Sequence, residues 1–146
     1  MNQSFSGSYT HNLDKKGRVS LPVRFRESLV GRVHITRGAD DERYLWVFSD
    51  DGWTLMVNKL NGLPNNKMGN EVRRHFIGNE HESKIDRLGR IQISPLLREY
   101  ARLDREVVIM GVGDRIEIWE KSIKEKHDAA SEQDGVIQKY MEELGI

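Results

Sequence analysis

The chain has 146 residues, of which 37% are hydrophobic and 32% charged, and its 23 basic and 23 acidic side chains give a formal net charge of zero. The absence of cysteine excludes disulfide bonds and thiolate metal sites, and no apolar run approaches the roughly 18 residues that a membrane-spanning helix requires. We therefore expect a cytoplasmic protein with no signal peptide and no membrane partner, and one that is not a non-specific polycation.

The first predicted element is a strand over residues 8–12, which leads into the hexapeptide LDKKGR at residues 13–18. A similar hexapeptide, IDRLGR, occupies residues 85–90 and follows a predicted strand over 82–85. We call residues 14–18 loop 1 and residues 86–90 loop 2. Each loop begins with Asp and ends with Gly-Arg, and its glycine permits a left-handed turn or a close approach to a ligand. The repetition indicates that a larger unit has been duplicated.

Alternating apolar and polar residues after loop 1 predict a strand over 19–21, and Pro22 then suits the first turn of a short helix. Strands over 33–37 and 43–48 follow, joined by GADDE. Asp50 and Asp51 are expected to cap a helix, whose apolar face is formed by Trp53, Met56, Val57 and Leu60.

The breaker-rich segment NGLPNN at residues 61–66 predicts a linker before a second helix. That helix is expected to carry an apolar stripe on one side and charges facing outward on the other. The stripe consists of Met68, Val72 and Phe76, and the outward charges are Glu71, Arg73 and Arg74.

The second copy repeats the first with small changes. A strand is predicted over 91–93, Ser94 is a good N-cap for a helix that begins at Pro95, and strands over 107–111 and 115–120 are joined by a VGD turn. An amphipathic helix over 121–144 follows, with Gly135 as a weak point, and its broken heptad pattern favours a docking helix over a coiled coil.

These elements predict an α+β fold made of two β-α-β-β half-units. Strands this short cannot bury both faces alone, whereas two copies that pair into one closed β-barrel would share a core and remove the exposed edges. We divide the chain into a first repeat (1–62), a linker helix (63–79), a second repeat (80–125) and a C-terminal helical tail (126–146).

Positive charge is concentrated at the two copies of the motif. Residues 14–26 contain five cations against one anion, and residues 84–98 contain four against one, whereas the segment from residue 117 to the end has eight acids and four bases. The aspartates at the start of each loop are most simply explained as turn caps. The cations of two matched loops favour duplex DNA, because lysine suits phosphate and arginine can grip a guanine edge in the major groove.

The segments LDKKGRVSLPVRFRE and IDRLGRIQISPLLREYARL, with RRHFIGNEHESKIDRLGR leading into the second, strongly resemble the MraZ family over about residues 5–125. The resemblance implies a swapped-hairpin barrel of the AbrB-like, double-split type. It also implies a transcriptional regulator of the division and cell-wall gene cluster that assembles into a homo-oligomeric ring and binds direct repeats in its own promoter. A nucleoid-associated location is the corresponding expectation.

Carried over to this sequence, the resemblance places the DNA contacts on both loops. Arg18 would be the main base-contacting residue, Lys15 and Lys16 would clamp phosphate, and Asp14 would belong to the same motif. The counterparts in loop 2 are Asp86, Arg87 and Arg90. Because Leu88 stands where loop 1 has Lys16, we expect loop 2 to contribute less electrostatic affinity.

Two other functions remain open from the residues. One is a non-enzymatic oligomeric scaffold whose basic loops bind an acidic protein. The other, with less support, is a metal-dependent nuclease that uses Asp14 or Asp86. We expect no enzyme activity, no cofactor and no metal site, because the five histidines lack ligand spacing and no catalytic constellation is recognisable.

Overall fold

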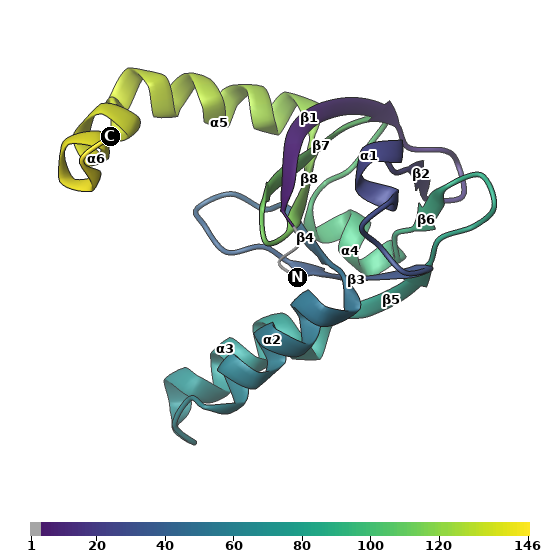
Figure 1. Cartoon of the computed structure of the whole chain (residues 1–146), viewed down its shortest axis with the longest axis horizontal. Helices are drawn as coiled ribbons and strands as arrows, with labels where there is room; N and C mark the ends of the chain where they lie inside the picture. Colours follow the sequence, from purple (N-terminus) through teal and green to yellow (C-terminus); the bar gives the residue numbers. More distant parts are fainter. Residues whose placement is uncertain (1–3) are drawn as a thin grey trace.

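The computed structural model describes residues 4–146, and the order of its strands repeats along the chain (Figure 1). The first half-unit contains β1 (Phe5–Asn12), β2 (Arg18–Ser20), α1 (Val23–Arg26), β3 (Arg32–Arg37) and β4 (Leu45–Phe48). The second contains β5 (His81–Lys84), β6 (Arg90–Gln92), α4 (Pro95–Tyr100), β7 (Glu106–Gly113) and β8 (Ile116–Glu120). Between them lie α2 (Asp50–Asn61), α3 (Lys67–Phe76) and the 3-10 turn η1 (Ile77–Asn79), and α5 (Lys121–Asp134) and α6 (Val136–Leu144) end the chain.

The predicted strands all occur, with bounds that differ by at most three residues from expectation. When the strand before each loop is included, the half-unit is β-β-α-β-β and not β-α-β-β. Residues 1–3, which open the segment in which no signal peptide was expected, lie outside the described residues.

Four of the six strand pairs join one half-unit to the other, and only β3–β4 and β7–β8 lie within a half-unit. The larger sheet is antiparallel with the order β1-β7-β8-β4-β3-β5, and β2 and β6 form a separate antiparallel pair. If each strand of the larger sheet is replaced by its equivalent from the other half-unit, the result is the same strand order read in the opposite direction. Trp46 faces Glu117 in the β4–β8 pair and Val19 faces Ile91 in the β2–β6 pair, so a pseudo-twofold axis passes through both pairs.

The closed barrel that we expected is not observed in the hydrogen bonding of residues 4–146. The larger sheet ends at β1 and β5, and the β2–β6 pair remains a second sheet. The reason is that each half-unit turns away from the larger sheet at its loop. After β1 and after β5 the chain enters a tight turn, and the short strand that follows pairs with its own counterpart instead of with an edge of the larger sheet.

The hydrophobic core receives equivalent side chains from both half-units. Three equivalent pairs of these side chains, each side chain at most 3% exposed, are Val19 and Ile91, Leu21 and Ile93, and Phe25 and Leu97. Phe25 also packs edge-to-face on Phe5 and Tyr9, with ring centroids 5.7 and 5.5 Å apart. Burial of each large apolar side chain contributes about 1.5–3 kcal/mol, so neither half-unit would keep its core if separated from the other.

The helical hairpin of α2 and α3 departs from the sequence prediction in how its helices begin. Ser49, not Asp50 or Asp51, caps α2, because its Oγ accepts a hydrogen bond from Gly52 N at 3.1 Å while both aspartates already lie in the first turn. In α3 the cap is Asn66, whose Oδ1 accepts from Gly69 N at 2.9 Å.

The predicted faces of α3 need two corrections. Met68, expected in the apolar stripe, is 79% exposed, whereas Phe76 is buried as expected. Arg73, expected to face outward, instead donates to the backbone carbonyls of Leu60 and Leu63, each at 3.0 Å. Its guanidinium donates to carbonyl groups at the C-terminal end of α2, and it can reach them only when the hairpin is folded.

The C-terminal segment forms two helices and not the single helix that periodicity predicted. Gly135 adopts a left-handed conformation with φ +63° and ends α5, and α6 then takes a new direction away from the sheet (Figure 1). Of the predicted seven-residue repeat, Ile137 and Leu144 are exposed. Within residues 4–146 no helix is long and apolar enough to cross a membrane.

The three tryptophans pack against other aromatic rings of the chain. Trp119 stacks on Tyr44 with ring centroids 4.2 Å apart, Trp46 stacks on Phe76 at 5.0 Å, and Trp53 lies parallel to the His34 ring at 5.8 Å. All three tryptophans therefore serve in packing within the chain.

Candidate nucleic-acid interface

Loop 1 is a tight turn organised by one carboxylate. Asp14 Oδ1 accepts hydrogen bonds from the backbone N–H groups of Lys16 and Arg18, each at 2.9 Å, and Oδ2 accepts one from Arg18 Nε at 2.8 Å. Backbone bonds from Asp14 N to Arg18 O and from Gly17 N to Asp14 O close the turn. Gly17 has φ +80°, a conformation that side-chain-bearing residues rarely adopt. The spacing of Asp, Gly and Arg is thus required by the hydrogen bonding of the turn itself.

Loop 2 reproduces this geometry closely. Asp86 Oδ1 accepts from the backbone N–H groups of Leu88 and Arg90, each at 2.9 Å, and Oδ2 accepts from Arg90 Nε at 2.8 Å. Gly89 has φ +79°. Two segments 72 residues apart therefore adopt one conformation, which explains why the hexapeptide occurs twice in so short a chain.

Both aspartates are held in the ionised state by their loops. The pKa of Asp14 is lowered mainly by the backbone N–H of Arg18, with smaller contributions from the Arg18 side chain and the Lys16 N–H. The pKa of Asp86 is lowered in the same way by Arg90 and Leu88. Each carboxylate accepts three hydrogen bonds within its own loop, so these oxygens act as turn caps. This engagement argues against the nuclease alternative, in which they would bind a metal.

The arginine that ends each loop is oriented by its aspartate and remains accessible. The side chains of Arg18 and Arg90 are 30% and 28% exposed, and within residues 4–146 each makes its side-chain hydrogen bond through Nε alone. An ion pair that engages only Nε fixes the plane of the guanidinium and leaves both terminal amino groups with donors for a further acceptor.

The remaining cations of the loops project into solvent. Lys15 and Lys16 in loop 1 and Arg87 in loop 2 are exposed. Leu88, in the place of Lys16, is 67% exposed. Loop 2 therefore presents an apolar side chain where loop 1 presents a positive charge, and the two loops match in backbone but not in charge.

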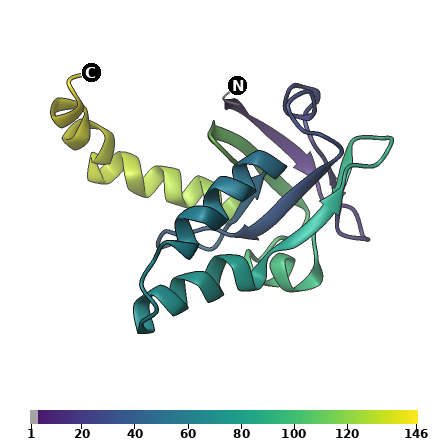
Figure 2. The ribbon, with the colours of Figure 1, turned by 60° about the horizontal axis from the view of Figure 1, so that its bottom comes forward.

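The fold brings both loops to one end of the molecule (Figures 1 and 2). Arg18 faces Gln92, and Ser20 faces Arg90, across the β2–β6 pair. That pairing is extended into the loops, because Leu21 N donates to Gly89 O and Ile93 N donates to Gly17 O, each at 2.9 Å. All seven candidate residues thus lie on two adjoining loops: Asp14, Lys15, Lys16, Arg18, Asp86, Arg87 and Arg90.

Two further arginines contact the loops and were given no role from the sequence. Arg98 lies against Gly17, and Arg26 lies against Gly89, so each comes from the half-unit opposite to the loop that it touches. The sequence feature that could have identified these arginines is the Arg-Glu pair that both copies share at residues 26–27 and 98–99. Periodicity alone could not distinguish these arginines from solvated helix charges.

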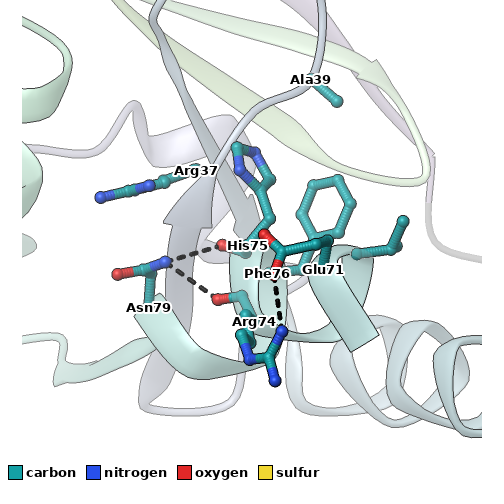
Figure 3. Close-up of a pocket in the computed structure, with 8 residues that line it drawn as sticks. Arg37, Ala39, Glu71, Arg74, His75, Phe76 and Asn79 are labelled. Atoms are coloured by element: carbon teal, nitrogen blue, oxygen red, sulfur yellow. Dashed lines mark hydrogen bonds and ion pairs between the residues drawn. The ribbon is translucent and has the colours of Figure 1, made fainter. Parts of the chain in front are cut away.

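A cavity of about 470 Å³ lies away from the loops, beside α3 and the start of the β3–β4 connection (Figure 3). Several of its polar side chains already have partners. Asn79 Nδ2 donates to the carbonyls of Arg74 and His75 at 3.0 and 3.1 Å, and Arg74 Nη1 pairs with Glu71 at 2.5 Å. No loop residue lines this cavity, so it is not part of the candidate interface.

Metal-binding groups are not gathered anywhere in the described part of the chain. Residues 4–146 contain no cluster of three or more histidine and carboxylate side chains placed to hold an ion.

Comparison with known proteins identifies a family and several relatives to which this chain is similar. A family model described as "MraZ protein, putative antitoxin-like" matches residues 4–71 and 76–142. A protein named "Transcriptional regulator MraZ" from Alkaliphilus oremlandii is 41% identical over 145 residues, which cover 97% of this chain and 99% of that protein. A relative of the same name from Moorella thermoacetica is 44% identical over 124 residues, which cover 84% of this chain and 85% of that protein. Another, from Carboxydothermus hydrogenoformans, is 42% identical over 120 residues, which cover 82% of this chain and 82% of that protein.

Proposed function

The chain belongs to the MraZ family, and from this premise we propose that it regulates transcription by binding specific sequences of duplex DNA through loops 1 and 2. The gene cluster that it controls is the division and cell-wall cluster, and its binding sites are direct repeats in its own promoter. It acts in the cytoplasm, in association with the nucleoid.

One observation carries this proposal. Two loops of the same conformation, each ending in an oriented and accessible arginine, lie side by side about a pseudo-twofold axis. Duplex DNA has local twofold symmetry in its backbone, and a protein needs both phosphate contacts for register and base contacts for sequence. A symmetric pair of cationic loops provides both kinds of donor.

The roles of the individual residues follow from their geometry. Arg18 and Arg90, whose guanidinium planes are set by Asp14 and Asp86, contact base edges, where a planar fork matches guanine O6 and N7. The exposed cations Lys15, Lys16 and Arg87 contact phosphates, which require charge but little directional precision. Loop 2 binds more weakly, because Leu88 cannot replace the charge of Lys16.

In this proposal residues 1–62 and 80–125 are AbrB-like repeats of the swapped-hairpin type, connected by the segment 63–79 and followed by the tail 126–146. Copies of the chain assemble into a ring that presents the loops at regular intervals. Regularly repeated loops favour direct repeats, because each bound loop raises the effective concentration of the next.

The residue assignment is tested by Arg18→Ala in a mobility-shift experiment on the DNA upstream of the protein's own gene, with unrelated DNA as competitor. We expect the specific shift to be lost while the circular dichroism spectrum is unchanged. Arg74→Ala is the matched control, because Arg74 is a well-exposed arginine on α3, beside a cavity that no loop residue lines, and should leave the shift intact.

Retention of parental affinity by Arg18→Ala would show that the assignment of the base contact is wrong. If the unsubstituted protein does not distinguish its upstream DNA from the competitor at all, the oligomeric scaffold that binds an acidic protein becomes the better explanation.

A further inference from the structure

Each loop is covered by an arginine from the other half-unit. A Cβ atom added at Gly17 would lie 2.5 Å from Arg98 Cζ, and one added at Gly89 would collide with Arg26 Nη1. Distances this short mean that the guanidinium groups lie directly on the glycine faces of the two turns. Gly17 and Gly89 are both buried although the residues around them are largely exposed.

The two arginines also share an unusual hydrogen-bonding state. Arg26 Nε and Arg98 Nε are buried, and neither has a hydrogen-bond partner within residues 4–146. Neither side chain forms an ion pair in that part of the chain, in contrast to Arg18 and Arg90. Leaving a buried donor unpaired is destabilising, so contact with the turn must offset this cost if the arrangement is to persist.

Backbone contacts cross between the half-units at the same places. Ile93 N, next to the start of α4, donates to Gly17 O, and Leu21 N, next to the start of α1, donates to Gly89 O. In addition, Gln92 Nε2 donates to Lys16 O at 2.5 Å. Each loop is therefore fixed between its own aspartate and the strand and helix of the opposite half-unit.

From this juxtaposition we propose that Arg98 positions loop 1, and Arg26 positions loop 2, for contact with duplex DNA. The inference rests on the proposed function and deepens it. Both arginines are positioning residues that act through the opposite loop. Each fixes the position of that turn and adds a positive charge next to it. Each DNA-contacting loop is thus a composite of both half-units.

The crossed arrangement is tested on the free, full-length protein by the backbone amide resonances of Gly17 and Gly89 in a ¹H–¹⁵N spectrum. Arg98→Ala is expected to shift the Gly17 resonance and to leave Gly89 in place, and Arg26→Ala is expected to do the converse. Arg24→Ala is the matched control, because Arg24 lies on α1 beside Arg26 but bonds to Ser6 Oγ at 2.9 Å, and it should move neither resonance.

Binding to the upstream DNA is then measured for the same variants. Arg98→Ala should weaken binding by about tenfold or more, the effect of losing one well-placed contact, and Arg26→Ala by less, because loop 2 is the weaker loop. Arg98→Lys retains the charge without the planar group, so it should recover part of the affinity while the Gly17 resonance remains shifted.

The outcomes separate this inference from the proposed function. A shift of the glycine on the same half-unit, equal shifts of both glycines, or full recovery of both readouts by Arg98→Lys would overturn the crossed positioning. So would crossed shifts without any loss of DNA affinity in either variant. Failure of the unsubstituted protein to bind its upstream DNA would instead overturn the proposed function, and the spectra would still decide whether the contacts cross.

Discussion

At the scale of single residues, the two loop aspartates account for the shape of the candidate interface. Each accepts two backbone N–H groups and one Arg Nε within five consecutive residues. The acid therefore has a structural role in its turn, and it orients the arginine that we assign to base contact. Because all partners of the carboxylate are local, the hexapeptide sets the conformation of the turn, whereas the opposite half-unit contributes to its position.

The lowered pKa values of Asp14 and Asp86 predict a specific acid response. A carboxyl whose pKa is lower in the folded than in the unfolded state contributes stability that is present above its ordinary pKa and is lost as the pH falls through the lowered value. The double variant Asp14→Asn/Asp86→Asn should therefore melt below the parent at neutral pH, and the difference in Tm should shrink below about pH 4.

Melting curves from pH 7 to pH 2 measure this difference, with Asp134→Asn as the control. Asp134 is exposed at the end of α5, and its side chain forms no hydrogen bond in the described chain, so this variant should follow the parent at every pH. A difference between parent and double variant that stays constant down to pH 2 would contradict the proposed role of the ionised carboxylates.

At the scale of secondary-structure elements, α2 illustrates how a helix start is decided. Three polar residues in a row, Ser49, Asp50 and Asp51, could each cap it, and the structure selects Ser49, which has extended backbone angles and is buried. Asp50 Oδ1 instead forms hydrogen bonds with His34 Nε2 at 2.6 Å and Arg32 Nε at 2.9 Å, both on β3. The contact between α2 and β3 therefore determines which of the three residues becomes the cap.

Removal of this cap should destabilise the protein measurably. Ser49→Ala should lower the free energy of unfolding by about 1 kcal/mol, because the Gly52 N–H loses its acceptor in a partly buried position. Asp51→Ala should lower it by only about 0.3 kcal/mol, since an exposed acid in the first turn contributes only through the helix dipole. Urea unfolding of both variants provides the comparison, and an equal or reversed order would show that the cap is misassigned.

At the scale of the whole molecule, four strand pairs connect one half-unit to the other. β1 pairs with β7, β3 with β5, β4 with β8 and β2 with β6, and the core receives matching side chains from both halves. Neither half-unit can lose its structure without removing hydrogen-bond partners from the other. Duplication within one chain thus produces one cooperative unit.

This interlocking predicts a single unfolding transition for the body of the protein. Tryptophan fluorescence, which reports on Trp46 and Trp53 near the first half-unit and Trp119 in the second, should give the same urea midpoint as circular dichroism of the strands. The variant Ile91→Ala, made in the second half-unit, should lower both midpoints together, because Ile91 packs opposite Val19. Two separate midpoints would show that the half-units unfold independently.

The proposed ring assembly predicts that DNA affinity depends on the phase of the proposed direct repeats. Moving two adjacent repeats apart by half a helical turn, about 5 base pairs, places the second site on the opposite face of the duplex, so loops on one ring cannot reach both. Binding should weaken, whereas a full turn of about 10 base pairs should restore part of it. Affinity that does not vary with spacing would argue against simultaneous binding of several loops.

The sequence by itself determined the features that depend on near neighbours. The conformation of each loop needs only one aspartate, one glycine and two or three amides within five residues, so the repeated hexapeptide was sufficient to predict two matched turns. The residue pattern along the chain located all eight strands to within three residues, and the repeated hexapeptide revealed the duplication.

Only the tertiary structure decided the features whose partners lie far apart in the chain. The pairing of β2 with β6 in place of closure into one barrel, the use of Arg73 by the end of α2, and the contacts of Arg98 with Gly17 and Arg26 with Gly89 join residues up to about 80 positions apart. A hydrophobic period specifies which face of an element is buried, but it carries no information about which distant segment covers that face. That choice is made by the packing of both half-units together.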